Sequence, residues 1–294
     1  MKPSTPSLIL WGALGAAGAA GAVNAADVTE HSTTRQTYHL DPATAHRLEV
    51  RAISGMITVQ GSPESDVEVL IDKTVTAETQ QDLATANREV TLESSADESL
   101  VRAIVREPHQ AACGEESHGW HGSWSEPRYR VRFDFTIRVP ADTRLTLCTI
   151  NKGDVAVKGV RGDFWVHSVN GRITFQDAGG SGEAVTVNGP ITASFTTAPS
   201  AASLFKSVNG SVILTLPDTA SADLQMKTLN GGLYTDFNAQ TLSAQAPAVL
   251  EKRDGLTVYR SNGFTSVRIG SGGPKLTLDT LNGDARVLRP FPSR

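Results

Sequence analysis

The segment "EPHQAACGEESHGWHGSWSEPRYR" is the most unusual in this chain, because it gathers side chains that suit metal binding or ligand recognition. Four of them can bind a metal: His109, Cys113, His118 and His121. Imidazole and thiolate ligands suit zinc or copper. The spacing H-x3-C-x4-H-x2-H, however, matches no standard zinc pattern. We therefore predict no metal site and no cofactor, and keep a metal- or redox-responsive role for residues 109–148 only as an alternative.

The same segment is rich in aromatic side chains. Trp120 and Trp124 lie beside His118 and His121, and together they could form a binding lip. Indole rings offer a large apolar face that stacks on a sugar ring or packs against a partner protein. The simpler interpretation is a long hairpin loop whose aromatic rings pack on the flank of the domain. Both interpretations stay open on the sequence alone.

The first 25 residues have the form of a secretory signal peptide. They carry one Lys, an Ala/Gly-rich apolar centre and a Val23-x-Ala25 ending. The apolar part is shorter than the ~20 residues that span a membrane. We expect cleavage after Ala25 or Ala26, export to the periplasm or cell surface, and no membrane span afterwards. Without Lys2 the 27 basic residues become 26, against 31 acidic ones, for a net charge of −5.

The mature chain holds two cysteines, Cys113 and Cys148. Export places them in an oxidising compartment, and two cysteines permit a single pairing. A bridge between them would close a loop of 35 residues. The chain-entropy model gives such a bridge roughly 4 kcal/mol of stabilisation. The alternative is two unrelated buried thiols.

Composition and patterning point to an all-β protein. Short alternating runs such as "RYRVRFDFTIRV" dominate the 294 residues, and long amphipathic helical patterns are scarce. Residues 78–90 have helical composition and are predicted to form one short helix. The charge is nearly balanced, without the basic stripe typical of nucleic-acid binders. We therefore expect no nucleic-acid partner.

A short Asn-Gly phrase recurs along the second half of the chain, as in "VNGRITF" at 169 and "VNGPITA" at 187. The aligned glycines are 153, 171, 189, 210, 231 and 283, in steps of 18, 18, 21, 21 and 52. Periods near 20 residues indicate a solenoid, in which equivalent corners stack at the strand spacing of ~4.8 Å. An antiparallel β-sandwich or meander is the alternative, with Asn-Gly as a hairpin turn.

In the solenoid interpretation the recurring residues form a structural corner ladder. Asn would tolerate left-handed backbone geometry and bond to its neighbours, and Gly would supply a positive φ. Asn262 is a weaker member of this set. The predicted ladder is Asn151, Asn170, Gly171, Asn188, Gly189, Asn209, Gly210, Asn230, Gly231, Asn282 and Gly283.

These patterns divide the chain into five parts. The phrase "PKLTLDTLNGDARVLRP" is expected to form the final coil at the far end of the stack. The parts are a signal peptide (1–25), an N-terminal β cap with the first coils (26–107), the Cys/His/Trp-rich insertion (108–128), the solenoid repeats (129–289) and a tail (290–294).

The recurring "VNG-x-[IV]" phrases, the opening "LEVRAISGMITVQG" and the closing "GGPKLTLDTLNGDARV" resemble the bacterial "putative adhesin" family of exported β-solenoid proteins. The resemblance covers roughly residues 46 to 289 and is strongest from Leu145 to Phe237. It implies a β-solenoid in the cell envelope, with no established catalytic residues. The insertion after residue 106 departs from the family pattern.

The sequence carries no recognisable catalytic motif. Asp154 and Asp284 both follow a corner glycine, but on distant coils, and no acid/base pair stands out. The tripeptide Arg161-Gly162-Asp163 can be an adhesion ligand in animals, yet turn chemistry explains its Gly and Asp. We therefore expect a non-enzymatic envelope protein with no catalytic residues. Its partner would be an envelope glycan or protein, and a carbohydrate-active enzyme is the alternative.

Overall fold

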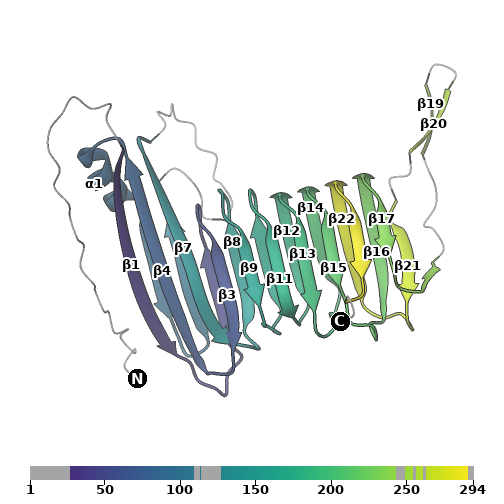
Figure 1. Ribbon diagram of the computed structural model, residues 1–294, viewed down its shortest axis with the longest axis horizontal. Coiled ribbons are helices and arrows are strands. Elements are labelled where there is room, and N and C mark those ends of the chain that lie inside the picture. Colours follow the sequence, from purple (N-terminus) through teal and green to yellow (C-terminus); the bar gives the residue numbers. More distant parts are fainter. Residues whose placement is uncertain are drawn as a thin grey trace.

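The computed structural model describes residues 27–108, 113, 127–242, 249–253, 256–260 and 263–290. Within these residues the chain is all-β with one short α-helix, which confirms the predicted fold class at that level. The strands form two large mixed sheets around a shared hydrophobic core, and one separate two-stranded hairpin (Figure 1). The predicted signal peptide and most of the insertion lie outside the described residues.

The spatial order of the strands in each sheet differs from their order in the chain. The first sheet consists, from edge to edge, of β1 (Val28–His39), β4 (Asp66–Ala77), β7 (Tyr129–Pro140), β3 (Ile57–Ser62), β9 (Val155–Lys158), β11 (Ile173–Ala178), β13 (Ile191–Phe195), β15 (Val212–Thr215), β23 (Ala285–Leu288) and β17 (Leu233–Thr235). The second sheet consists of β18 (Ala239–Thr241), β21 (Thr265–Ile269), β16 (Ala222–Asn230), β22 (Lys275–Asn282), β14 (Ser203–Asn209), β12 (Gly182–Asn188), β10 (Phe164–Ser168), β8 (Arg144–Thr149), β2 (Arg47–Arg51), β6 (Leu100–Arg106) and β5 (Thr91–Ala96). The hairpin is β19 (Val249–Arg253) with β20 (Leu256–Arg260).

From β8 to β17, successive strands alternate between the second sheet and the first. Each strand then pairs in parallel with a strand of a neighbouring repeat, so that Ile173, Ile191 and Val212 lie in one row. All three side chains are fully buried, because equal repeat positions face the same core. The layers are those of a β-sandwich, but an antiparallel meander is wrong for this part of the chain.

The last repeat is not at the end of the stack. β22 lies between β14 and β16, and β23 lies between β15 and β17. The expectation that residues 274–290 form the final coil at the far end is therefore wrong. The physical reason is that the corner phrases are almost identical, so the local sequence does not assign a slot. In the second sheet the slot beyond β16 is taken by β21, which pairs with it in antiparallel register.

The N-terminal end is built differently. β1, β4 and β7 have 12 residues each and pair in antiparallel fashion. Helix α1 (Gln80–Glu89) packs on these three strands, which confirms the predicted short helix. Thr79 caps the helix, since its hydroxyl oxygen accepts a hydrogen bond from the backbone N–H of Asp82 at 3.1 Å.

The corner asparagines are joined by side-chain amide hydrogen bonds. Asn188 donates to Asn170 at 2.8 Å, and Asn209 donates to Asn188 at 2.8 Å. Asn282 donates to Asn209 at 2.7 Å, and Asn230 donates to Asn282 at 2.6 Å. The amide chain therefore follows the spatial order of the repeats and not their order in the sequence. Separately, Asn151 makes a backbone bridge to Ser54, and Asn262 lies outside the described residues.

The corner glycines are required for space and not for a positive φ. Of the predicted set only Gly283 has a positive φ, of 146°, so the left-handed explanation is wrong for the others. A Cβ on Gly171 would lie 1.9 Å from the carbonyl oxygen of Gly153 in the corner below. At Gly189 and Gly210 the corresponding distances are 2.3 and 2.2 Å. Stacked corners approach so closely that a side chain cannot fit between them.

A hydroxyl two residues before each corner asparagine completes the corner, and it was not among the predicted corner residues. Thr186 donates to the carbonyl oxygen of Gly171 at 2.8 Å, and Thr280 donates to that of Gly210 at 2.8 Å. Ser207 and Thr228 do the same at 2.9 and 2.8 Å. These hydroxyls satisfy carbonyl oxygens at the tightly stacked corners. The full motif is therefore [ST]-x-N-G, which was visible in the sequence.

Candidate functional site: the disulfide face

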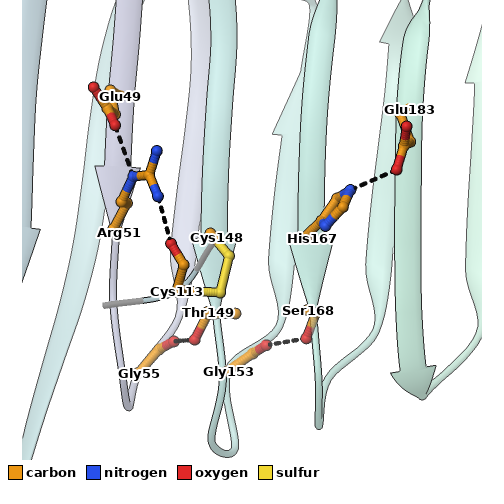
Figure 2. Close-up of a disulfide and its surroundings, with 10 residues drawn as sticks. All are labelled: Glu49, Arg51, Gly55, Cys113, Cys148, Thr149, Gly153, His167, Ser168 and Glu183. Carbon is orange, nitrogen blue, oxygen red and sulfur yellow. Dashed lines mark hydrogen bonds and ion pairs between the residues drawn. A yellow bond between two sulfur atoms is a disulfide. The ribbon is translucent and has the colours of Figure 1, made fainter. Parts of the chain in front are cut away.

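Cys113 and Cys148 form a disulfide with their Cα atoms 5.6 Å apart, so the predicted pairing is confirmed. Cys148 belongs to β8, in which Leu145 and Leu147 point into the core. Side chains alternate along a strand, so Cys148 points to the outer face of the second sheet. It is nevertheless only 1% exposed, because the chain at Cys113 covers it (Figure 2). We call this outer surface, from β6 to β22, the disulfide face.

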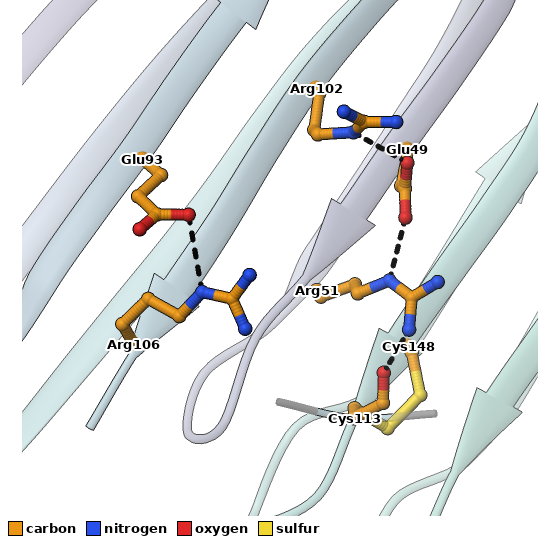
Figure 3. A network of polar contacts seen from close by, with 7 residues as sticks. All are labelled: Glu49, Arg51, Glu93, Arg102, Arg106, Cys113 and Cys148. Atoms are coloured by element: carbon orange, nitrogen blue, oxygen red, sulfur yellow. Dashed lines mark hydrogen bonds and ion pairs between the residues drawn. A yellow bond between two sulfur atoms is a disulfide. The ribbon is translucent and has the colours of Figure 1, made fainter. Parts of the chain in front are cut away.

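A polar network holds the covering chain in place. Glu49 accepts hydrogen bonds from the Nε atoms of Arg51 and Arg102, both at 2.7 Å. Arg51 also donates from Nη1 to the carbonyl oxygen of Cys113 at 2.7 Å (Figure 3). Burial alone would raise the pKa of the Glu49 carboxyl, but the hydrogen bonds from Arg102 and Arg51 outweigh it and hold this pKa below its ordinary value. The carboxylate is therefore ionised where it anchors Arg51.

On the other side of the disulfide lies an aromatic cluster. Cys148 and His167 are partners in the register of β8 and β10 (Figure 2). The rings of His167 and Trp165 stack with their centroids 3.7 Å apart. His167 Nε2 lies 2.9 Å from an oxygen of Glu183 on β12. Burial lowers the pKa of His167 against the opposing effect of Glu183.

Beside this cluster the disulfide face is hollowed. A shallow hollow of about 540 Å³ is lined by Trp165, Glu183, Leu204, Lys275 and Thr277 among others. It combines an indole face, an aliphatic side chain, a carboxylate and an ammonium group. Such a combination suits recognition of a sugar ring or an extended peptide, through stacking and a few directed hydrogen bonds.

The predicted binding lip itself is not placed by the structure. His118, Trp120, His121 and Trp124 lie outside the described residues, and the anchor of their segment is Cys113. Sequence reasoning missed Trp165, His167 and Glu183. The sequence feature that could have identified them is Trp165, the third Trp after the predicted signal peptide. It stands at an outward-facing position of an alternating strand.

The structure weakens two of the alternatives, a metal site and carboxylate catalysis. Cys113 is in a disulfide, so it cannot be a thiolate ligand, and both cysteines of the chain are bonded. The described residues contain no group of three or more His, Cys, Asp or Glu side chains that could hold a metal ion. Asp154 and Asp284, the carboxylates that share a repeat position, accept backbone N–H bonds from Arg172 and Gly232 at 2.8 and 2.9 Å. Both therefore serve the corners.

Comparisons with known proteins give no family. No family model and no curated protein matches the chain. A "putative cell adhesion protein" from Clostridium sporogenes is similar in structure, with a TM-score of 0.42 and 8% identity over 88% of this chain and 100% of that chain. A "putative adhesin" from Bacteroides fragilis gives a TM-score of 0.27 and 6% identity over 88% and 97%. These values are too low to establish a shared fold or function, so the family resemblance stays a prediction.

Across the part of the chain that the structure describes, no helix is long and apolar enough to cross a membrane.

Proposed function

We propose that this chain is an exported, non-enzymatic protein of the cell envelope that binds a glycan or protein through the disulfide face. In this proposal residues 129–289 form a β-solenoid, a rigid scaffold whose outer surface carries the site. The single observation behind the proposal is the Cys113–Cys148 disulfide, which attaches the Trp-rich insertion one strand away from His167. Neighbouring strands are ~4.8 Å apart, so Cys113, by which the insertion is attached, lies on the same face as the hollow at Trp165.

The proposal assigns separate roles to the residues. Trp165 would supply the stacking surface, while Glu183 and Lys275 would supply directed polar contacts at the hollow. Trp120 and Trp124 of the insertion would supply further stacking surface. The disulfide would keep the insertion attached to this face.

A glycan array with the exported chain tests this assignment. Trp165→Ala should lower binding of any retained glycan by about 5- to 150-fold, since loss of one aromatic stacking contact costs ~1–3 kcal/mol. The matched control is Leu229→Ala, which removes an apolar side chain that is 66% exposed at a corner away from the hollow. Equal binding by the Trp165 variant and the unaltered protein would exclude the disulfide face as the site.

A further inference from the structure

A second polar site lies at the opposite end of β2 and β8. Arg47 begins β2 and Arg51 ends it, so the ends are ~13 Å apart at the rise of a β-strand. A groove of about 630 Å³ lies at the Arg47 end, within the usual range for small-ligand sites. We call it the arginine groove; among its lining residues are His46, Arg47, Arg144, Arg161 and Asp163.

The groove exists because turns from distant segments stack on one another. The backbone N–H of Arg47 donates to Ser99 at 2.7 Å, and that of Arg144 donates to His46 at 2.9 Å. The backbone N–H of Arg161 donates to Ala141 at 2.5 Å. Arg47 and Arg144 are direct partners in the register of β2 and β8. Arg47, Arg144 and Arg161 therefore line one groove at the ends of neighbouring strands of the second sheet.

The guanidinium groups are available to a ligand. Within the described part of the chain, the side chain of Arg161 has no hydrogen bond or ion pair. The side chain of Arg47 has none either among these residues, and it interacts electrostatically with Asp97 without a hydrogen bond. Arg144 lies 3.4 Å from Asp163, with the two side chains 64% and 53% exposed. Such an exposed pair is worth at most about 1 kcal/mol, so an incoming oxyanion can compete for Arg144. Arg binds carboxylate and phosphate oxygens in a bidentate manner.

One lining residue of the arginine groove, His46, is buried. It lines the groove but is only 7% exposed, and its Nδ1 has no hydrogen-bond partner among the described residues. Its Nε2 lies 2.9 Å from the carbonyl oxygen of Asp41, which can only accept, so Nε2 carries the hydrogen. Nδ1 is itself buried, so a ligand in the groove does not reach it. His46 instead supports the groove through its backbone carbonyl, which accepts the hydrogen bond from the backbone N–H of Arg144.

The tripeptide Arg161-Gly162-Asp163 lines the arginine groove, and its three residues have different roles there. A Cβ on Gly162 would lie 2.2 Å from the carbonyl oxygen of Thr143, so the turn must be glycine to stack. Asp163 accepts a hydrogen bond from the backbone N–H of Ser181 at 3.0 Å and faces Arg144. Its carboxylate is thus occupied within the fold, which supports the turn interpretation, and Arg161 is the member left to meet a ligand.

We propose that the arginine groove binds an oxyanion, the carboxylate of an acidic saccharide or the phosphate of an envelope polymer. Arg47, Arg144 and Arg161 bind the oxyanion. The inference does not rest on the function proposed for the disulfide face.

The test is calorimetric titration of the exported chain at low ionic strength with trigalacturonate, glycerol phosphate and neutral cellotriose. We expect one of the two anions to bind and cellotriose not to bind, and the anion that binds identifies the source of the oxyanion. Arg47→Gln with Arg161→Gln should weaken that binding at least tenfold. The matched control, Arg130→Gln with Arg138→Gln, removes the same charge from exposed positions of β7 and should leave binding unchanged.

Several results would overturn the inference: cellotriose bound as tightly as the anions, no binding of either anion, or equal losses in the two double variants. Trp165→Ala serves as a separate readout, because that residue lies on the disulfide face. It should leave anion binding unchanged even if it abolishes the glycan binding proposed above. Failure at one site is therefore distinguishable from failure at the other.

Discussion

The repeat stack and the N-terminal layer are held together by different means. The repeat stack is β8 to β17 with β22 and β23; the N-terminal layer is β1, β4, β7 and α1. In the stack, most parallel partners are about one repeat apart, and the corners at Asn170, Asn188, Asn209, Asn282 and Asn230 are each secured by an amide, a hydroxyl and a glycine. In the N-terminal layer, long antiparallel strands pair, with Val28 opposite Ala77 and Tyr129 opposite Ala77.

The two regions differ in what determines how their strands pair. The stack repeats one local device, so its corners are nearly interchangeable and the order of its repeats depends on long-range pairing. The N-terminal layer has no such device among its described residues and depends on the alternation of buried and exposed residues along its strands. The disulfide lies at the boundary, in β8, where the stack begins.

The largest expected effect concerns the inserted repeat. Leu278 is fully buried in β22 and lies between Phe205 of β14 and Met226 of β16. Leu278→Ala should lower the free energy of unfolding by about 2–5 kcal/mol. Amide exchange should accelerate in both β14 and β16, as measured by hydrogen–deuterium exchange. Leu281→Ala is the control, because Leu281 lies in the same strand but is 42% exposed. Faster exchange in only one of the two neighbouring strands would contradict the position of β22 between β14 and β16.

The disulfide comes next. Replacing both Cys113 and Cys148 by Ser opens a loop of 35 residues and should cost roughly 2–4 kcal/mol in chemical denaturation. Proteolysis of the double variant should begin in the insertion, because its attachment to β8 is lost. A double variant as stable as the unaltered protein would show that the disulfide at β8 does not stabilise the fold.

Gly171 separates crowding from backbone strain. Gly171→Ala should lower stability by about 1–3 kcal/mol, because the new Cβ meets a backbone carbonyl that cannot move freely. Gly159 is the control, since it has a φ of +65° but no atom within 4 Å of the point that a Cβ would occupy. Gly159→Ala should cost only about 1 kcal/mol in thermal unfolding. If Gly159→Ala lowers stability more than Gly171→Ala does, backbone conformation and not crowding would explain the glycine at the corner.

The amide chain predicts a graded effect. Asn188 lies inside it and takes part in two amide bonds, whereas Asn230 is at its end and takes part in one. Asn188→Ala should therefore cost more than Asn230→Ala, with about 0.5–1.5 kcal/mol for each bond lost. Chemical denaturation of the two variants and their double mutant would measure this. Equal costs would show that the bonds do not act along the stack.

The smallest effect is the pH dependence at the boundary. The pKa of Glu49 is lowered in the folded chain, so its stabilisation is full above the unfolded value of about 4.3 and is lost as the pH falls through the folded pKa. Glu49→Gln should cost about 1 kcal/mol or less at neutral pH and should flatten the stability curve below pH ~4.3. The control is Glu93→Gln. Glu93 pairs with Arg106, and the Glu93 side chain is 61% exposed. An unchanged acid limb would contradict the role of Glu49.

Part of the candidate site could be predicted from the sequence. The unusual insertion and the pairing of Cys113 with Cys148 both follow from residue types and compartment. Trp165 and His167 were not predicted, because an outward position in a strand has no meaning until its neighbours are known. The arginine groove was equally hidden, since Arg47, Arg144 and Arg161 are far apart in the chain and meet only through stacked turns.

The sequence by itself determined the all-β class, the alternating strands, the Asn-Gly corners and the single cysteine pairing, because each depends on local periodicity or on simple counting. The tertiary structure alone decided the order of the repeats, the crowding that requires Gly171, and the surfaces on which Cys148 and Arg144 meet their neighbours. Near-identical corners have nearly equal local energies, so only contacts between distant segments can choose among them.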